Sequence, residues 1–456
     1  MSKRLVLTCL CCCILSALPN NLLAQGLQPY PNGATDKLFH AKTPMLPPPA
    51  NTVFADPDFG SLMVRVTDQN TDPKAPSGYF YNSRGSTNEW SADGRKFFVI
   101  GQHARDLAFA FDPVTMKISS LPPVPSGQGF PIPLRPDATF SFLDSDLMYG
   151  TTFADPLTIS QYRFSTNAVT PILDLTTCAT QPLLQKGSNF SSDGMAISAD
   201  DSRFSVSAGG KQFGKNFVVI VYDKKFGCRW YNTQTGQIGG PWGQSGTVSI
   251  PDRYQVRHSS ISGSGRYVRI GVDGPIGFYV WDVVTLNVTA CLSGGRKQGC
   301  TTYGAVGENS YVGEAGAGDE MNTLKWPLGN MAGVTRITSM PLPHYWGNIR
   351  HFAWRPGQLD DNAPVCGNTY SYDGDINVTQ PYDGEIFCLE TDGLASTIWR
   401  FGHNRAVWNP TYFYSDPFGN ISLDGNFLLF ASTWDGQVGT TPTGGPRSDT
   451  WIIKLR

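Results

Sequence analysis

One short pattern recurs along the chain. Residues 420–430 read Asn-Ile-Ser-Leu-Asp-Gly-Asn-Phe-Leu-Leu-Phe, and residues 89–99, 196–206 and 260–270 follow the same plan. Each consists of a short strand, a turn of the Ser-x-Asp-Gly type and a second, apolar strand. Asp-Gly between apolar runs is typical of a hairpin, because glycine adopts the positive φ that a tight turn requires. A unit that recurs in this way predicts a repeat architecture.

The composition favours a turn-rich all-β protein. The 456 residues include 49 glycines and 33 prolines, aromatic residues make up 12%, and only 16% are charged. Helical chains contain fewer turn formers, and disordered chains carry more charge and fewer aromatic residues. The net charge of −2 gives no support for nucleic-acid binding.

Seven units of about four strands can be followed, at residues 90–121, 139–175, 196–238, 256–291, 302–337, 350–401 and 419–455. The last unit has three strands, whereas residues 62–68 form a lone strand without a unit. We predict that this N-terminal strand completes the last sheet, since such closure protects an unpaired edge. The predicted fold is an all-β propeller of about seven four-stranded blades, one domain over residues 61–456. The fifth unit is faint, so six or eight blades remain alternatives.

The N-terminus has the pattern of a secretory signal peptide. Lys3 and Arg4 precede an apolar run at residues 5–18, and Ala24 offers a small residue before the cut. We predict a signal peptide at 1–24 and an extended lead-in at 25–60, with a lipid or uncleaved anchor as the alternative. No later apolar run is long enough to span a bilayer, so we expect a secreted or periplasmic protein.

Removal of the signal peptide leaves six cysteines, an even number that favours disulfides in an exported chain. Cys291–Cys300 and Cys366–Cys388 are close in sequence and are the first predicted pairs. Cys178–Cys228 follows by default. No pair has the C-x-x-C spacing of a zinc site.

A resemblance rests on the turns and on two third strands. Residues 91–95 (Ser-Ala-Asp-Gly-Arg), 422–426 (Ser-Leu-Asp-Gly-Asn), 221–223 (Val-Tyr-Asp) and 280–282 (Val-Trp-Asp) resemble the repeats of TolB-type propellers of exported bacterial proteins. The same repeats form the propellers of oligogalacturonate lyases. The resemblance extends over residues 60–456 and implies the fold. Because binding proteins, hydrolases and lyases share this fold, it leaves the function open.

The histidines are predicted to gather on one face of the ring. In a four-stranded blade, the loop that enters the first strand and the loop between the second and third strands lie on the same face. This places His103, His258, His344, His351 and His403 on that face, and leaves His40 outside. For each histidine, a hydrogen bond between blades is the alternative to a functional role. For the group, we predict a functional site on this face.

These loops supply candidates for eliminating a uronate, a reaction that needs a neutralised carboxylate, a base and an acid. Arg350 or Arg405 is predicted to bind the carboxylate in a bidentate manner, through two N–H groups of its guanidinium. His258, His351 and Tyr414 complete the predicted catalytic set. The predicted substrate-binding residues are His103, Lys211, Trp346, Trp408 and Trp434, because aromatic faces stack on sugar rings.

A metal centre is a further hypothesis. His258, His351 and His403, with a carboxylate, could bind a divalent ion, because neutral imidazoles suit Mn or Zn. The resemblance to oligogalacturonate lyases also implies a histidine-rich metal centre, but this chain lacks their Gln-x-x-His-x-His cluster. We expect either one divalent metal ion (Mn, Ca or Zn) or a metal-free arrangement.

The predicted function is therefore a secreted carbohydrate-active propeller, with a polysaccharide lyase that cleaves a uronate polysaccharide as the first hypothesis. A non-catalytic binding propeller and a glycoside hydrolase are the alternatives. The chain has no G-x-S-x-G, G-x-G-x-x-G or P-loop motif, which disfavours peptidase and nucleotide chemistry. We expect a monomer whose partner is an acidic polysaccharide or oligosaccharide.

Overall fold

The computed structural model describes residues 29–456, except 84–86, 103–104, 137, 179–182, 185–194, 211–215, 250–252, 273–276, 292–299, 316–322, 338–348, 370–379, 394–396 and 410. It does not describe the side chains of 300–303, 314–315 and 349–351. The predicted signal peptide lies outside the described residues. Among the residues it does describe, no helix has the length and apolar character needed to cross a membrane.

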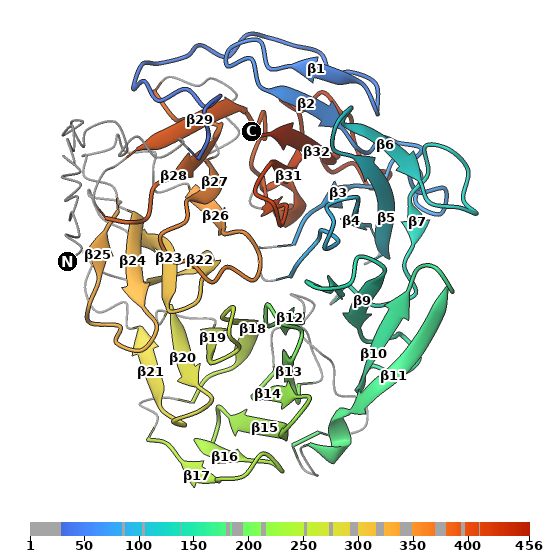
Figure 1. Cartoon of the computed structure of the whole chain (residues 1–456). Coiled ribbons are helices and arrows are strands. Elements are labelled where there is room, and N and C mark those ends of the chain that lie inside the picture. The colour runs from blue at the N-terminus through green and yellow to red at the C-terminus, as the bar shows by residue number, and fades with distance from the viewer. Residues whose placement is uncertain are drawn as a thin grey trace, which may run out of the picture.

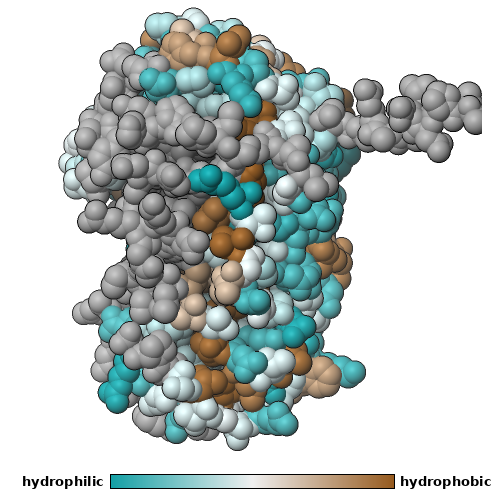
Figure 2. Space-filling view, turned by 90° about the vertical axis from the view of Figure 1, so that its left-hand side faces the viewer, coloured by the Kyte–Doolittle hydropathy of each residue, from teal (hydrophilic) through white to brown (hydrophobic). Residues whose placement is uncertain are grey.

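In the described residues the strands form seven antiparallel sheets, which surround a central channel like the blades of a propeller (Figure 1). This confirms the predicted fold class. Figure 2 views the ring from the side of blades 5 and 6 and shows a disc whose described surface mixes hydrophilic and hydrophobic residues. Blades are numbered here in the chain order of their innermost strands.

Blades 1 to 3 run from the channel outwards in chain order. Blade 1 contains β3 (Phe80–Tyr81), β4 (Lys96–Gly101), β5 (Arg105–Asp112) and β6 (Lys117–Ser120), with β7 (Phe130–Pro131) paired to β5. Blade 2 contains β8 (Thr139–Phe140), β9 (Leu147–Gly150), β10 (Thr158–Arg163) and β11 (Ala168–Asp174), followed by the short 3₁₀ helix η2 (Leu175–Thr177). Blade 3 contains β12 (Ala196–Ile197), β13 (Arg203–Ala208), β14 (Val218–Asp223), β15 (Gly227–Asn232), β16 (Gln237–Gly239) and β17 (Gly246–Thr247).

Blades 4 to 6 repeat the four-stranded plan. Blade 4 contains β18 (Val256–Ile261), β19 (Tyr267–Val272), β20 (Phe278–Asp282) and β21 (Val288–Cys291). Blade 5 contains β22 (Cys300–Val306), β23 (Ser310–Ala315), β24 (Thr323–Pro327) and β25 (Thr335–Arg336). Blade 6 contains β26 (Ile349–Ala353), β27 (Val365–Thr369), β28 (Glu385–Leu389) and β29 (Ile398–His403), followed by the 3₁₀ helix η5 (Phe413–Ser415).

Blade 7 is closed by the N-terminal part of the chain. Its inner strands are β30 (Gly419–Ile421), β31 (Phe427–Ser432) and β32 (Asp449–Lys454), and its outer strands are β2 (Leu62–Arg65) and β1 (Val53–Ala55). Val64 lies opposite Ile452 in the antiparallel register of β2 and β32. The predicted closure is therefore confirmed. The physical reason is that β2 covers an edge of β32 that would otherwise expose unpaired backbone groups.

The Ser-x-Asp-Gly turns are built by their own side chains. In blade 1 the Ser91 hydroxyl donates to Asp93 Oδ1 at 2.7 Å and accepts from the Lys96 amide at 2.8 Å, while Gly94 has φ 66°. In blade 7 the Ser422 hydroxyl donates to Asp424 Oδ1 at 2.5 Å. The sequence pattern therefore encodes the turn locally, because every partner lies within five residues.

The innermost strand of blade 1 differs from the prediction that this unit begins at Trp90. Phe80 and Tyr81 pair with β4, residues 82–83 and 87–88 lie outside the ladder, and Trp90 forms an isolated bridge with Phe97. The excursion is held by polar side chains: Asn82 donates to Glu89 Oε2 at 3.0 Å, and the Ser83 amide donates to Glu89 Oε1. The first half of the strand therefore comes from a segment that the turn pattern does not mark.

Residues 30–60, called here the N-terminal strap, lie along the outer strands of blades 6 and 7 (Figure 1). Ala34 and Arg400 exchange two backbone hydrogen bonds of 2.9 Å. Tyr30 packs edge-on against Trp399 and Phe401, each with a centroid distance of 5.5 Å. The strap therefore extends the sheet of blade 6 at one point and that of blade 7 through β1.

Two predicted disulfides are confirmed. Cys366 and Cys388 lie opposite one another on β27 and β28 and are joined. Cys178 is joined to Cys228, which links the segment after η2 to β15 of blade 3. Cys291 is also disulfide-bonded; the side chain of its predicted partner, Cys300, lies outside the described residues.

Candidate functional site

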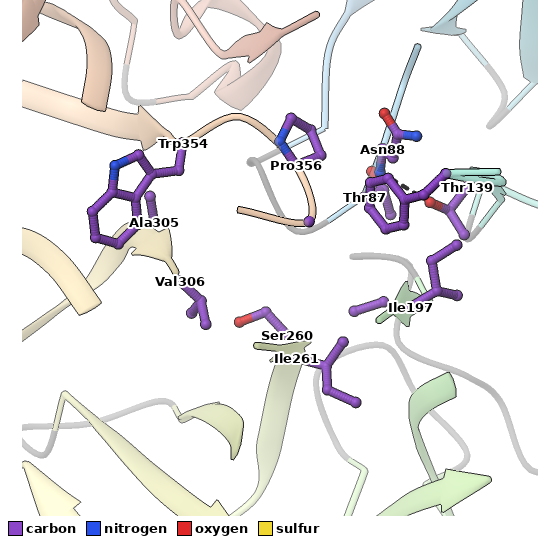
Figure 3. Close-up of a pocket in the computed structure, with 13 residues that line it drawn as sticks. Thr87, Asn88, Thr139, Ile197, Ser260, Ile261, Ala305, Val306, Trp354 and Pro356 are labelled. Atoms are coloured by element: carbon purple, nitrogen blue, oxygen red, sulfur yellow. Dashed lines mark hydrogen bonds between the residues drawn. The ribbon is translucent and has the colours of Figure 1, made fainter. Parts of the chain in front are cut away.

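The central channel is narrow near the face that carries the Asp-Gly turns. A loop of blade 6 crosses there, and a Cβ at Gly357 would lie 3.2 Å from atoms of both Phe142 in blade 2 and Ala199 in blade 3. Above it lies a cavity of about 40 Å³ lined by Thr87, Asn88, Thr139, Ser260 and apolar neighbours (Figure 3). This space holds about three water molecules.

The opposite face carries an aromatic cluster at the junction of blades 7 and 1. We call it the aromatic shelf; it consists of Tyr79, Tyr81, Tyr412, Phe413 and Tyr414. Tyr79 and Tyr81 lie at the start of β3, and the other three lie in the loop that enters β30. Both segments are where innermost strands begin, so the shelf lies at the rim of the channel.

The geometry of the shelf leaves part of it open to solvent. The rings of Tyr79 and Tyr414 stack with centroids 3.6 Å apart and planes 4° apart. Phe413 meets Tyr81 edge-on at 5.3 Å and is 46% exposed. Exposed rings on a rigid base are suited to stacking against the C–H face of a ligand, because their positions need no further ordering.

The shelf phenols are hydrogen-bond donors at neutral pH. Burial raises the pKa of Tyr414 to about 12, with the neighbouring phenols Tyr79 and Tyr412 adding to the shift. Burial also raises the pKa of Tyr79. A phenol with a raised pKa keeps its proton, so Tyr414 is suited to donate a proton or hydrogen bond and unsuited to act as a base.

His258 lies on the innermost strand of blade 4 and contacts Arg269 on the neighbouring strand of the same blade. Its Nε2 is 3.0 Å from Arg269 Nη1, and Arg269 covers the ring of Tyr311 in blade 5. A guanidinium can only donate, so Nε2 is the acceptor. A side chain at Gly271 would overlap the imidazole. His258 is 5% exposed, and its Nε2 lone pair is already used, which does not fit a metal ligand or a base.

His403 does not lie in a loop that enters the last blade, as predicted, but ends the outermost strand of blade 6. It is fully buried beneath the strap, with Nε2 3.6 Å from Asp58 Oδ2 and its ring edge-on to Phe59. Burial lowers its pKa to about 3, although Asp58 acts in the opposite direction. The prediction was wrong because β29 runs further than its apolar pattern indicates.

Arg405 and Trp434 hold the strap in place. Arg405 donates to Thr43 O at 2.7 Å and to Asp435 Oδ2 at 3.2 Å, and Lys42 Nζ lies 2.5 Å from Asp435 Oδ1. Trp434 is fully buried and donates from Nε1 to Met45 O at 2.9 Å. The contacts that occupy these side chains are therefore structural.

The predicted metal triad is not brought together by the part of the chain that the structure describes. His258 is on the innermost strand of blade 4 and His403 on the outermost strand of blade 6. Among the described residues no group of three His, Cys, Asp or Glu side chains could bind a metal ion. Arg350 and His351 lie on β26, the innermost strand of blade 6, and their side chains are outside the description.

Some of the remaining predicted site residues lie outside the described residues, and others are described. His103, Lys211 and Trp346 lie outside the described residues. Trp408 is half-buried in the loop between β29 and β30, which also carries the shelf residues 412–414. Tyr414 is buried and belongs to the shelf. The structure therefore places one predicted catalytic residue, Tyr414, beside an exposed aromatic surface.

Glu89 was missed by sequence reasoning. It is fully buried on the channel side of blade 1, and burial raises its pKa to about 8 although Ser83 and Asn82 hydrogen-bond it. A signal was available. The residue two positions before the turn serine is Ala196, Ser260 or Asn420 in other repeats, so a charged residue there departs from the pattern.

No family model matches the chain, and no curated protein matches it. Among solved structures it is similar to oligogalacturonate lyase from Vibrio parahaemolyticus, with a TM-score of 0.50, 12% identity, and coverage of 89% of this chain and 96% of that chain. An oligogalacturonate lyase in complex with manganese has a TM-score of 0.52, 12% identity, and coverage of 93% and 98%. The Pan2 WD40 domain of Neurospora crassa has a TM-score of 0.46, 11% identity, and coverage of 86% and 95%. At these identities the similarity establishes that the chain has the propeller fold, and only that.

Proposed function

We propose that the protein is an exported propeller that binds a saccharide on the aromatic shelf. The observation that carries this proposal is the stacked Tyr79–Tyr414 pair with the exposed Phe413 beside it, at the rim of the channel. The disulfides support export, because such bonds persist in oxidising compartments.

The chemistry of the shelf suits a sugar ring. The face of a pyranose is a flat array of C–H groups bordered by hydroxyls. Phe413 offers an exposed ring for the C–H groups, and Tyr79 and Tyr414 keep phenolic protons that hydroxyl oxygens can accept. An aromatic contact of this kind contributes about 1 kcal/mol, so loss of one ring weakens binding several-fold.

A second candidate function is β-elimination of a uronate at the same rim. It is favoured by the similarity to oligogalacturonate lyases over nearly the whole chain. In this proposal Tyr414, with its raised pKa, protonates the leaving oxygen. Arg350 neutralises the uronate carboxylate and His351 removes the proton. His258, His403 and Arg405 have no part in it, because each is occupied by other contacts.

The shelf is tested with Phe413→Ala and with wild-type protein, titrated calorimetrically with a panel of neutral and acidic oligosaccharides. We expect one oligosaccharide class to bind and Phe413→Ala to weaken it by about fivefold. Phe153→Ala is the matched control, since Phe153 is 64% exposed on blade 2 and away from the shelf. Equal affinity of wild type and Phe413→Ala for every ligand would reject the shelf as the site.

Elimination is tested by absorbance of the unsaturated uronate product, with and without manganese and with chelator. A rising absorbance that Tyr414→Phe reduces would establish the second candidate. Constant absorbance with an oligosaccharide that binds would reject the second candidate and support a non-catalytic binding protein.

A further inference from the structure

The face of the ring that carries the Asp-Gly turns has a basic, aromatic area on blade 3. We call it the blade 3 basic surface, and it consists of Arg203, Lys224, Lys225, Phe226, Arg229 and Trp242. These residues come from the start of β13, the turn from β14 to β15, β15 itself and the loop after β16. In an antiparallel blade the turns from first to second and from third to fourth strand lie at the same end. The surface therefore lies on the face opposite the aromatic shelf.

Two stacked rings form its centre. Phe226 and Trp242 have centroids 5.9 Å apart and planes 9° apart. Phe226 is 48% exposed, and Trp242 is half-buried. Asp223 Oδ1 accepts the amides of Lys225 at 2.8 Å and of Phe226 at 3.0 Å. The turn is thus fixed by its own hydrogen bonds, and it presents Phe226 outward without loss of further chain entropy.

Two guanidinium groups lie against Trp242. Arg203 and Arg229 each have Cζ 4.9 Å from the centroid of that ring. Arg203 pairs with Asp223 at 2.7 Å, whereas the partners of Arg229 among the described residues are the carbonyls of Val283 and Trp242. Burial and the charge of Arg203 lower the pKa of Arg229. Two like charges are held together here, and a single carboxylate balances them.

The two lysines add charge that no acid compensates. Lys224 and Lys225 are exposed, and within the described part of the chain neither has a carboxylate at ion-pair distance. Lys225 Nζ lies 5.0 Å from the Phe226 centroid, and Lys224 Nζ lies 5.4 Å from those of Tyr149 and Phe204. Three cations thus lie against one stacked pair, and Lys224 extends from the same turn towards Tyr149 and Phe204, in a protein whose net charge is −2. Arg203 is paired with Asp223, and contacts with aromatic rings stabilise the other cations, which have no carboxylate at ion-pair distance in the described residues.

We propose that the blade 3 basic surface binds a polyanionic saccharide chain, such as a polyuronate, at a site separate from the aromatic shelf. The stacked rings contact the flat face of a sugar, and the cations bind carboxylates that recur along the polysaccharide. The spacing of charges in a polymer lets several weak exposed contacts act together. The proposal rests on its own residues and does not depend on the shelf being a binding site.

A polysaccharide fits these observations better than a nucleic acid or an anionic membrane. The cations are grouped around one aromatic pair and do not form the extended stripe that a nucleic-acid backbone requires. A protein segment that binds a membrane surface is amphipathic and has a wide apolar face. On blade 3, by contrast, the exposed aromatic ring is that of Phe226.

The test uses the mature, full-length protein and polygalacturonate immobilised on a surface. The double variant Lys224→Ala/Lys225→Ala is expected to weaken binding at least tenfold and to flatten the fall of affinity with rising NaCl. Phe226→Ala is expected to weaken it about threefold. Lys117→Ala/Lys454→Ala removes the same charge from other blades and is expected to bind like wild type.

Several outcomes would overturn the proposal. The first is wild-type binding by the blade 3 variants, and the second is an equal loss in the control variant. The third is that duplex DNA or vesicles of anionic phospholipid bind the wild-type protein as tightly as polygalacturonate does, or more tightly. The shelf is judged separately: Phe413→Ala should keep polygalacturonate binding, and Lys224→Ala/Lys225→Ala should keep binding of the short oligosaccharide found for the shelf.

Discussion

Two regions of the ring place an arginine over a tryptophan and also contain lysine, and they differ in how the charges are balanced. At the strap, Arg405 covers Trp434, and Asp435 accepts from both Arg405 and Lys42. On blade 3, Arg229 covers Trp242 and, among the described residues, donates only to carbonyls. In the first region Arg405 and Trp434 are buried, whereas the second presents an exposed ring and exposed lysines.

The difference shows that residue type alone does not identify a binding site. Both regions contain the same side chains, and both look equally suited to an acidic sugar in the sequence. At the strap every charge already has a partner from the same chain, so the interaction energy is used for folding. On blade 3 the lysine charges have no such partner, so they remain available to a ligand.

The largest expected effect is on the strap. Arg405→Met leaves Asp435 buried with only Lys42 and removes the hydrogen bond to Thr43 O. We expect the free energy of unfolding to fall by about 3 kcal/mol, because the charge-assisted hydrogen bonds of Arg405 to Asp435 and to Thr43 O are lost together. Denaturant titration measures this. Arg163→Met, which breaks an exposed pair with Asp144, is the control and should stay close to wild type. Retained stability together with lost turnover would return Arg405 to a catalytic role.

A smaller effect is expected from pH, and it also belongs to the strap. The pKa of buried His403 is about 3, below the ordinary value of 6.5. The unfolded chain therefore binds a proton between these values and the folded chain does not. The contribution of neutral His403 to the free energy of unfolding is fully present above pH 6.5. It falls as the pH falls below this value, by up to about 1.4 kcal/mol per pH unit.

The pH effect is measured as unfolding free energy against pH for wild type and His403→Gln. The groups that act on the imidazole are Asp58, Arg405, Lys42 and Arg400. Only the imidazole is removed in the variant, so its curve should be flatter between pH 4 and 6.5. Parallel curves for the two proteins would show that His403 is not buried under the strap.

The smallest expected effect is on blade 3. Lys224→Ala and Lys225→Ala remove exposed amines without acidic partners, so each should change the free energy of unfolding by less than about 0.5 kcal/mol. Thermal unfolding of the two variants checks this. A loss similar to that of Arg405→Met would mean that the lysines stabilise the fold, and the contrast between the two regions would disappear.

Much of the fold followed from local sequence. The Ser91–Asp93–Gly94 turn forms from contacts within five residues, so its repetition marked four of the blades. The strand runs between the turns then predicted about seven blades, which the sheets confirm. The unfinished last unit and the unassigned strand near residue 62 predicted the closure. The start of blade 1 at Phe80 was not foreseen, because Phe80 and Tyr81 lie before the repeat and no turn signal marks the segment between them and Trp90.

The candidate site followed from the sequence only in part. Assignment of loops to faces placed Tyr414 at the rim, where it joins the shelf. It could not separate the rim from the outer edge, so Arg405, Trp434 and His403 were given functional roles although the strap covers them. Their partners are far away in the chain: Lys42 and Asp435 are separated by 393 residues, and Met45 and Trp434 by 389.

The sequence by itself determined the repeat, the turns, the ring closure and two disulfide pairings, because each depends on neighbours in the chain, on pattern or on counting. The tertiary structure alone decided which polar side chains remain free for a ligand. That choice depends on the strap folding back over blades 6 and 7, and on the cations of blade 3 meeting around Trp242. Burial and charge pairing are properties of the assembled surface, and no short stretch of sequence contains them.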